Sequence, residues 1–263
     1  MPDGLPLGQV TNCGEDIGKD YEVGVGAVGE VRLVLQQMIG EYKRQEGPKE
    51  RGDGQGSAQR VATVREEFNA EWEPRLTSDE VPISPYRVFR ELEHAFGDNI
   101  IITHDSGFPR NQLTPLWKSI SPGSYIGWGK STQLGYGLGL SIGAKLAAPE
   151  KQVVNIMGDA AFGMSGLDLE TAVRSEIPIL TVVLNNAKMT AYDDYMPEAT
   201  KRYQSNLLGG NYAKIAEGLG AHSERVDTPG NLAAAIKRAE AANREGQAAL
   251  LEVLTKVEKK IAQ

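Results

Sequence analysis

The sequence predicts an α/β protein with a parallel sheet that is covered by helices on both faces. From Pro82 onward, short apolar runs alternate with segments that carry apolar residues at helical spacing. The runs are apolar along nearly their whole length, which is typical of parallel strands buried on both faces. Two of these runs, at 153–157 and 179–184, end in polar pairs. That edge of an open α/β sheet is where ligands bind.

The composition argues against several classes of function. The chain has 263 residues, 40% of them hydrophobic, and its net charge of -7 does not suit nucleic-acid binding. The longest apolar runs, such as 177–184, are too short to span a bilayer, and the first residues do not resemble a secretory signal. The single cysteine, Cys13, cannot form an internal disulfide, which fits a cytoplasmic protein. With so few cysteines and histidines, any bound metal should be a hard cation on oxygen ligands.

Residues 1–42 are expected to be the trailing part of a larger domain. A short alternating strand is predicted at Tyr21, Val23 and Val25, and an amphipathic helix from about Glu30. One strand and one helix cannot bury an apolar face by themselves. The rest of that domain should therefore lie in a missing segment or in another chain.

Residues 43–80 are predicted to form an exposed linker. The segment is charged and rich in glycine, and its acidic residues nearly balance its basic ones. Helical periodicity returns only over about 64–72, where a short helix is possible.

Residues 81–258 should form the main domain. Its predicted helices cover about 84–96, 134–145, 167–175, 212–218 and 232–243, its strands 100–103, 153–157, 179–184, 223–226 and 249–254, and a polar loop 104–110.

Two polar pairs carry the chemistry that the sequence suggests. Asp159 follows the strand 153–157, and Asn186 follows the next strand, 27 residues after Asp159. Consecutive strands joined by one crossover helix lie close together, so the two side chains should meet at one edge of the sheet. A carboxylate, an amide oxygen and backbone carbonyls suit a magnesium ion that also holds phosphate oxygens. The small residues Ala160 and Ala161 would let backbone N–H groups approach a phosphate.

These motifs resemble those of the thiamine diphosphate enzymes. Gly158-Asp159-Ala160 and the downstream Asn185-Asn186 match that family's signature, and LGYGLGLSIGAKLAAPEK at 134–151 precedes them at the family's spacing. The resemblance is to the branch of acetolactate synthases and 2-oxo acid decarboxylases, and it implies the thiamine diphosphate-binding fold of the diphosphate type over about 82–256. Residues 21–42 resemble the end of that branch's middle domain. The sequence departs from many relatives at Ala160 and at Thr190, where they have glycine.

The resemblance also implies a set of binding residues. Magnesium would be held by the side chains of Asp159 and Asn186 and by the backbone carbonyl of Lys188. Leu134 is placed like the bulky residue that bends the cofactor, and the carbonyl of Thr132 would accept a hydrogen bond from the cofactor's amino group. The complete cofactor-binding set is Asp105, Ser106, Thr132, Leu134, Gly158, Asp159, Ala160, Ala161, Asn186, Lys188 and Met189.

Other interpretations of these residues remain open at the level of sequence. Asp159 could be only a helix N-cap, and Leu134 could be only a core residue. Gly129-Lys130-Ser131 resembles the end of a phosphate-binding P-loop, but Ser124 stands where that motif needs its first glycine, and no strand leads directly into it.

The activity that the resemblance implies is a carboligase acting on 2-oxo acids, similar to acetolactate synthase. The alternatives are a 2-oxo acid decarboxylase or a 2-hydroxyacyl-CoA lyase of the same family, or a cofactor-binding or scaffold subunit without turnover. The family takes its activating glutamate from a separate pyrimidine-binding domain, and nothing in this sequence matches that glutamate's surroundings. The chain is therefore expected to hold no catalytic base and to act in a homo- or hetero-oligomer, either with a pyrimidine-domain subunit or as the C-terminal part of a longer protein.

Overall fold

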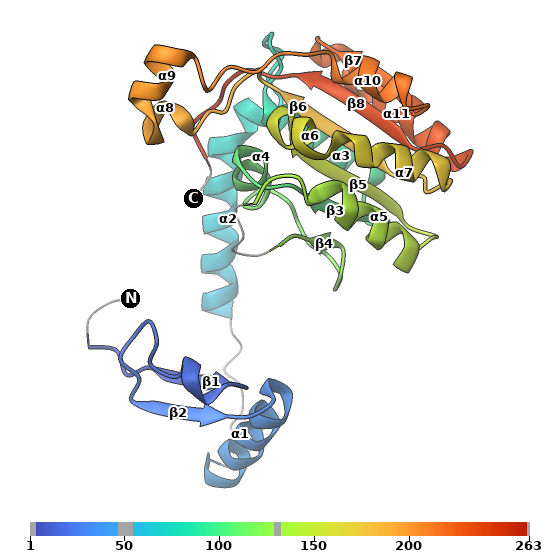
Figure 1. Ribbon diagram of the computed structural model, residues 1–263. Coiled ribbons are helices and arrows are strands. Elements are labelled where there is room, and N and C mark those ends of the chain that lie inside the picture. Colours follow the sequence, from blue (N-terminus) through green and yellow to red (C-terminus); the bar gives the residue numbers. More distant parts are fainter. Residues whose placement is uncertain (1–3, 47–54, 129–132, 262–263) are drawn as a thin grey trace. The chain divides into compact units, whose positions relative to one another are not determined.

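The computed structural model describes residues 4–46, 55–128 and 133–261 (Figure 1). Thr132 and the P-loop-like residues 129–131 lie outside the described residues. The chain divides into two compact units, Met1–Val64 and Arg65–Gln263. Within the described residues, no helix combines the length and the apolarity needed to cross a membrane.

Unit 1 contains two short parallel strands and a helix. Strand β1 (Gly8–Thr11) pairs with β2 (Val25–Val28), a 3-10 turn spans Gly14–Asp16, and helix α1 covers Val31–Glu46. The prediction of the helix is confirmed, but the strand expected at 21–25 was placed too early. Pairing with the first strand begins only at Gly24, whose N–H bonds to the carbonyl of Leu7. The apolar residues of the helix, among them Leu35 and Met38, stay exposed.

Unit 2 is built on a six-stranded parallel sheet, which confirms the predicted fold class (Figure 1). The strand order is β4-β3-β5-β6-β8-β7, and every neighbouring pair is parallel. The chain changes direction across the sheet between β3 and β5, which is the switch point where ligands bind in open α/β sheets. The strands are β3 (Ile100–His104), β4 (Tyr125–Ile126), β5 (Gln152–Gly158), β6 (Leu180–Asn185), β7 (His222–Val226) and β8 (Ala249–Leu254).

Helices cover both faces of this sheet and bury two apolar cores. One core lies under α3 (Pro85–Phe96), α11 (Leu232–Arg244) and the C-terminal part of α2 (Gln55–Leu76). The other core lies under four shorter helices. They are α5 (Gly137–Ala147), α6 (Asp159–Ser165), α7 (Leu169–Arg174) and α10 (Tyr212–Gly218).

The predicted linker at 43–80 needs correction, because much of it is helical. Helix α1 continues to Glu46, and α2 spans Gln55–Leu76. The end of α2 is anchored by Trp72, which is 2% exposed and packs edge-on against Tyr86 with ring centroids 4.9 Å apart. An isolated tryptophan in a charged segment gives no periodic signal, so the sequence did not predict this contact.

Several short elements near the ligand-binding edge were not predicted. The polar loop expected at 104–110 contains the start of α4 (Phe108–Leu113), and the two-residue β4 is too short to leave a pattern. Helices α8 (Tyr192–Tyr195) and α9 (Pro197–Tyr203) follow β6, and 3-10 turns occur at Gly166–Asp168 and Pro229–Asn231. The glycine-rich helix begins at Gly137 and not at 134, because Gly135 has a φ of +97°, which a right-handed helix excludes.

Candidate functional site

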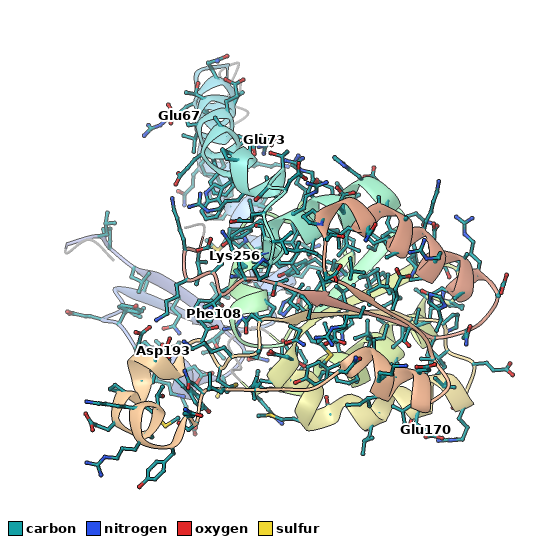
Figure 2. All side chains as sticks on the ribbon, turned by 90° about the horizontal axis from the view of Figure 1, so that it is seen from above. Glu67, Glu73, Phe108, Glu170, Asp193 and Lys256 are labelled. Atoms are coloured by element: carbon teal, nitrogen blue, oxygen red, sulfur yellow. The ribbon has the colours of Figure 1, made fainter. Side chains whose placement is uncertain are left out.

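A cavity opens at the carboxyl ends of the central strands. It has a volume of about 100 Å³ and is formed mainly by the segments that follow β3, β5, β6 and β8. Figure 2 shows Phe108 and Lys256 of its wall on one side of the domain together with Asp193, whereas Glu170 of α7 lies at the far end. Of the predicted binding residues, the cavity brings together Ser106, Leu134, Gly158, Asp159, Ala160, Ala161, Asn186, Lys188 and Met189.

Asp159 is the buried charged group of this cavity. It follows β5 without a loop, opens α6, and is 3% exposed. Its Oδ1 accepts a hydrogen bond of 2.8 Å from the N–H of Ala160, but its Oδ2 is buried without a hydrogen-bond partner. Burial raises the pKa of Asp159 to about 6, although the backbone N–H groups of Ala160, Ala187 and Lys188 act in the opposite direction. A buried carboxylate oxygen with no partner is costly, so this atom is poised to bind a cation.

The turn after β6 approaches the same carboxylate. Gly158 of β5 pairs with Leu184 of β6, so the ends of the two strands are adjacent. In the turn, the side-chain oxygen of Asn186 accepts a hydrogen bond of 3.0 Å from the N–H of Lys188. The side-chain NH₂ of Asn186 donates to the hydroxyl of Thr190 at 3.3 Å. Thr190 thus helps to orient the Asn186 amide.

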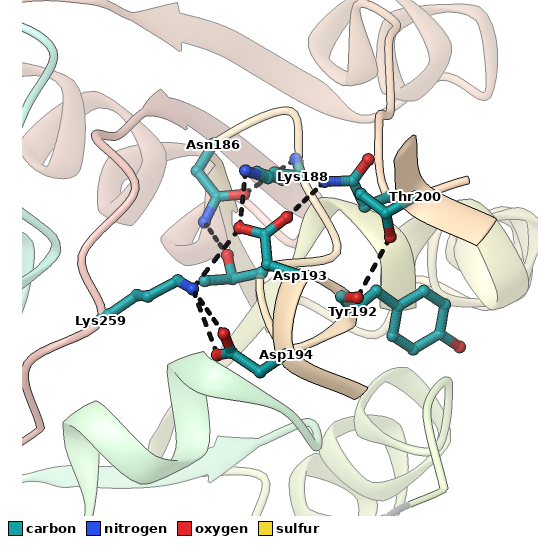
Figure 3. Close-up of polar contacts among 9 residues, drawn as sticks. Asn186, Lys188, Tyr192, Asp193, Asp194, Thr200 and Lys259 are labelled. Carbon is teal, nitrogen blue, oxygen red and sulfur yellow. Dashed lines mark hydrogen bonds and ion pairs between the residues drawn. The ribbon is translucent and has the colours of Figure 1, made fainter. Parts of the chain in front are cut away.

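The same turn is braced from outside the cavity. Met189 N–H donates to the carbonyl of Asn206 at 2.7 Å, and Leu208 N–H donates to the carbonyl of Ala187 at 2.9 Å. Figure 3 shows the ammonium of Lys188 paired with Asp193, at 2.8 Å. This pair and the two backbone hydrogen bonds fix the segment that carries Asn186 and the Lys188 carbonyl.

Lys259 ties the C-terminal segment to α8. Its ammonium lies 3.5 Å from Asp193 and 3.2 Å from Asp194 (Figure 3). The same segment contributes Thr255 and Lys256 to the cavity wall. This part of the site has no motif in the sequence, because its residues reach the cavity only through the path of the chain after the last strand.

Leu134 lines the cavity from the segment that precedes α5, and its side chain is half-buried. The positive φ of Gly135 turns the chain directly behind it, before α5 begins. A Cβ added at Gly107 would lie 3.7 Å from a methyl group of Leu134, so the loop after β3 packs close to this side chain. Leu134 is therefore both a packing residue and part of the cavity wall.

Asp105 does not line the cavity but holds the loop that does. Its carboxylate is fully buried and accepts hydrogen bonds from the N–H groups of Ser106 at 2.7 Å, Gly135 at 3.0 Å and Gly137 at 2.7 Å. The contact between Asp105 and the cofactor stays a prediction; here its oxygens accept from three backbone N–H groups. Its role is to fix the start of α5 beside the cavity.

Replacing Gly137 with alanine should lower the free energy of unfolding by about 1–3 kcal/mol. A Cβ at this position would lie 2.8 Å from Oδ1 of Asn155 and 2.9 Å from Oδ2 of Asp105, both buried and held. The steric cost should outweigh the gain in helix propensity of about 1 kcal/mol. Gly139→Ala is the matched control in the same helix, because a Cβ there meets nothing within 4 Å. Denaturant unfolding in which both variants are equally stable would contradict this packing.

His104 and its neighbours form a separate aromatic and polar group at the end of β3. His104 is buried, its Nδ1 lies 3.1 Å from the carbonyl of Asp105 and 3.3 Å from the hydroxyl of Tyr136, and burial lowers its pKa. A Cβ at Gly127 would collide with this ring. His104 is placed here as a packed residue outside the wall of the cavity described above.

The donor set at the cavity fits a magnesium ion bound together with phosphate oxygens. Among the described residues, no group of three or more histidine, cysteine or carboxylate side chains could hold a metal. The cavity instead offers one unpartnered carboxylate oxygen from Asp159, the amide oxygen of Asn186 and the backbone of Lys188. Magnesium is bound in proteins through one or two carboxylates, with phosphate oxygens and waters completing its coordination.

Comparison with known proteins identifies the family of this chain. The family model described as "Thiamine pyrophosphate enzyme, C-terminal TPP binding domain" matches residues 105–253. An acetolactate synthase large subunit of Mycobacterium tuberculosis is 32% identical over 236 residues, which are 89% of this chain and 41% of that protein. A probable acetolactate synthase large subunit of Methanococcus aeolicus is 29% identical over 234 residues, 85% of this chain and 39% of that protein.

A solved structure shares the fold. The thiamine diphosphate-dependent 4-hydroxybenzoylformate decarboxylase of Rhodococcus jostii RHA1 matches with a TM-score of 0.74 and 22% identity, over 99% of this chain and 46% of that chain. The chain thus spans about two fifths of the length of the curated relatives named above.

Proposed function

The chain belongs to the thiamine pyrophosphate enzymes and carries their C-terminal cofactor-binding domain. On that premise we propose that it is the diphosphate-binding part of a carboligase that acts on 2-oxo acids, similar to acetolactate synthase. The observation that carries the cofactor-binding part of the proposal is the unpartnered, buried Oδ2 of Asp159 beside the Asn186 turn. Asp159, Asn186 and the backbone carbonyl of Lys188 would hold a magnesium ion bound with the diphosphate.

The chain's own residues bind and orient the cofactor. When bound, thiamine diphosphate supplies the nucleophilic carbon that adds to the carbonyl of a 2-oxo acid. Ala160 and Ala161, at the start of α6, line the cavity, and their small side chains would leave room for the diphosphate. Leu134, in the segment before α5, would support the cofactor's ring system, and Met189 forms part of the cavity wall next to Lys188.

We further propose that the activating glutamate comes from a pyrimidine-binding domain outside this chain, within a homo- or hetero-oligomer. The length of the relatives supports this, since about three fifths of each lies beyond the part that this chain matches. Residues 1–42 are proposed to be the trailing part of a middle domain, because the apolar residues of α1 are exposed and need a partner surface.

A 2-oxo acid decarboxylase or a 2-hydroxyacyl-CoA lyase is the alternative within the family, and a cofactor-binding subunit without turnover is the alternative outside catalysis. The names of the relatives support the carboligase, whereas the structural match to a decarboxylase concerns the fold alone.

Product analysis separates these possibilities. We expect the chain, co-expressed with a pyrimidine-binding domain of this family, to convert ¹³C-labelled pyruvate to acetolactate in the presence of magnesium and thiamine diphosphate. Acetaldehyde as the main product in the NMR spectrum would identify a decarboxylase. Retention of the cofactor without consumption of pyruvate would favour the subunit without turnover.

A further inference from the structure

Glu252 is a fully buried carboxylate that lies outside the cavity. It sits in the middle of β8, between apolar neighbours that belong to the cores, and is 0% exposed. A buried charge is costly unless it is paired and hydrogen-bonded. Its Oε1 accepts a hydrogen bond of 2.7 Å from the side-chain NH₂ of Asn185, and its Oε2 accepts one of 3.0 Å from the N–H of Ala213. The Nε of Arg225 lies 3.7 Å from Oε1.

Asn185 connects Glu252 to the turn after β6, because its side chain hydrogen-bonds both Glu252 and Ala187. Its backbone carbonyl accepts a hydrogen bond of 2.9 Å from Thr255, which fixes it in the sheet. Its side-chain oxygen accepts a hydrogen bond of 3.0 Å from the N–H of Ala187. Because a carboxylate can only accept, Glu252 forces the NH₂ of Asn185 toward itself and so directs the amide oxygen toward Ala187.

Ala187 is the residue at which the chain turns. Its φ of 55° lies in the left-handed region, which costs a residue with a Cβ about 1–2 kcal/mol. Hydrogen bonds at both ends hold this conformation, from its N–H to Asn185 and from Leu208 to its carbonyl. The residues on either side, Asn186 and Lys188, both line the cavity.

We propose that Glu252 is a positioning residue for the magnesium site: through Asn185 it holds Ala187 in its left-handed conformation and so places Asn186 and the Lys188 carbonyl. This inference rests on the proposed magnesium and thiamine diphosphate binding. It adds a residue that touches neither ligand but orients the groups that do, and partners of this kind change metal affinity by about 10–100-fold when removed.

Two single substitutions and their combination test the hydrogen-bond pattern. Glu252→Gln leaves an NH₂ facing either Asn185 or Ala213, both of which are donors. Asn185→Asp places two carboxylates face to face. The double variant restores the hydrogen bonds among positions 185, 187, 213 and 252 but not the ion pair with Arg225. The carboxylate introduced at position 185 accepts from the amide introduced at position 252 and from the N–H of Ala187. The oxygen of that introduced amide in turn accepts from the N–H of Ala213. The double variant also has the same total charge as the wild type.

Affinity for MgCl₂ is measured by calorimetry with saturating thiamine diphosphate, on the full chain. Each single variant should bind magnesium about 10–100-fold more weakly, and the double variant should recover most of that loss. Amide hydrogen exchange of the metal-free protein should rise over 186–190 in the single variants and return in the double. Asn243→Ala is the matched control, because this buried amide bonds Ile179 at the opposite end of β6 and its loss should lower stability without changing magnesium affinity.

Wild-type affinity in Glu252→Gln, or a double variant no better than the single variants, would overturn the inference while leaving the proposed function intact. Absence of magnesium binding by the wild type itself would instead overturn the proposed function, and the inference with it.

Discussion

Asp159→Asn should abolish the magnesium-dependent binding of thiamine diphosphate. The substitution keeps the size of the side chain but removes the charge of the one unpartnered carboxylate oxygen in the cavity. Residues that only support a metal ligand change affinity by about 10–100-fold, so loss of a direct carboxylate ligand should exceed roughly 100-fold. Calorimetric titration of thiamine diphosphate with MgCl₂ measures this loss, with the exposed Asp168→Asn as a control of equal charge change. Undiminished binding by Asp159→Asn would contradict the assignment.

The same substitution should stabilise the metal-free protein at neutral pH. Burial raises the pKa of Asp159 from its ordinary 3.8 to about 6, so the folded chain binds this proton more tightly than the unfolded chain. The stability that the proton contributes is complete below about pH 3.8 and is lost as the pH rises through about 6. At pH 7.5 the wild type must therefore bury a charge that the asparagine variant lacks.

We expect the free energy of unfolding of metal-free Asp159→Asn to exceed that of the wild type by on the order of 2 kcal/mol at pH 7.5, and the difference to shrink toward pH 5. Urea unfolding in EDTA at both pH values measures it. A variant that is less stable than the wild type at pH 7.5 would show that the carboxylate already has a stabilising partner without metal.

The second large effect concerns turnover. The chain alone, saturated with cofactor and magnesium, should consume pyruvate at no more than a trace rate. It would lack the glutamate that activates the pyrimidine ring and the domain that excludes water from the other side of the cofactor. Loss of a positioned acid–base group costs about 10²–10⁴-fold, and the open cavity should add to that.

Adding a pyrimidine-binding domain in trans should restore the rate, and a variant of that domain without its glutamate should not. Robust consumption of pyruvate by the purified chain alone, with contaminating enzymes removed, would place a catalytic base among its own residues.

The sequence predicted most of the sheet and the cavity because both depend on local patterns. Apolar runs marked β3, β5, β6 and β8, and β7 was also predicted although most of its residues are polar. The polar residues Asp159 and Asn186 could be placed because strand ends in a parallel sheet share one edge. The limits of α10 and β8 agree with the predicted ranges. A motif at the end of a strand predicts where the residues next to that strand lie. It does not predict the path that the chain takes after them.

The features that were missed depend on contacts between distant segments. Helices α8 and α9 are short and are held by pairs such as Lys188–Asp193, and the end of α2 is fixed by one buried tryptophan. Glu252 lies 67 residues from Asn185 in sequence and touches it only because β6 and β8 are neighbours. The strand order that brings them together follows from the whole fold, so neither residue by itself indicates the pair.

Locating the metal directly is the strongest test of the proposed site. Crystals of the chain grown with thiamine diphosphate and MnCl₂, in which manganese takes the place of magnesium, allow the ion to be found by its anomalous scattering. The site predicts one peak within about 2.5 Å of Oδ2 of Asp159, the amide oxygen of Asn186 and the carbonyl oxygen of Lys188. The proposed site would be contradicted if the cofactor were bound but the manganese peak lay elsewhere, or if no peak appeared at the ends of β5 and β6.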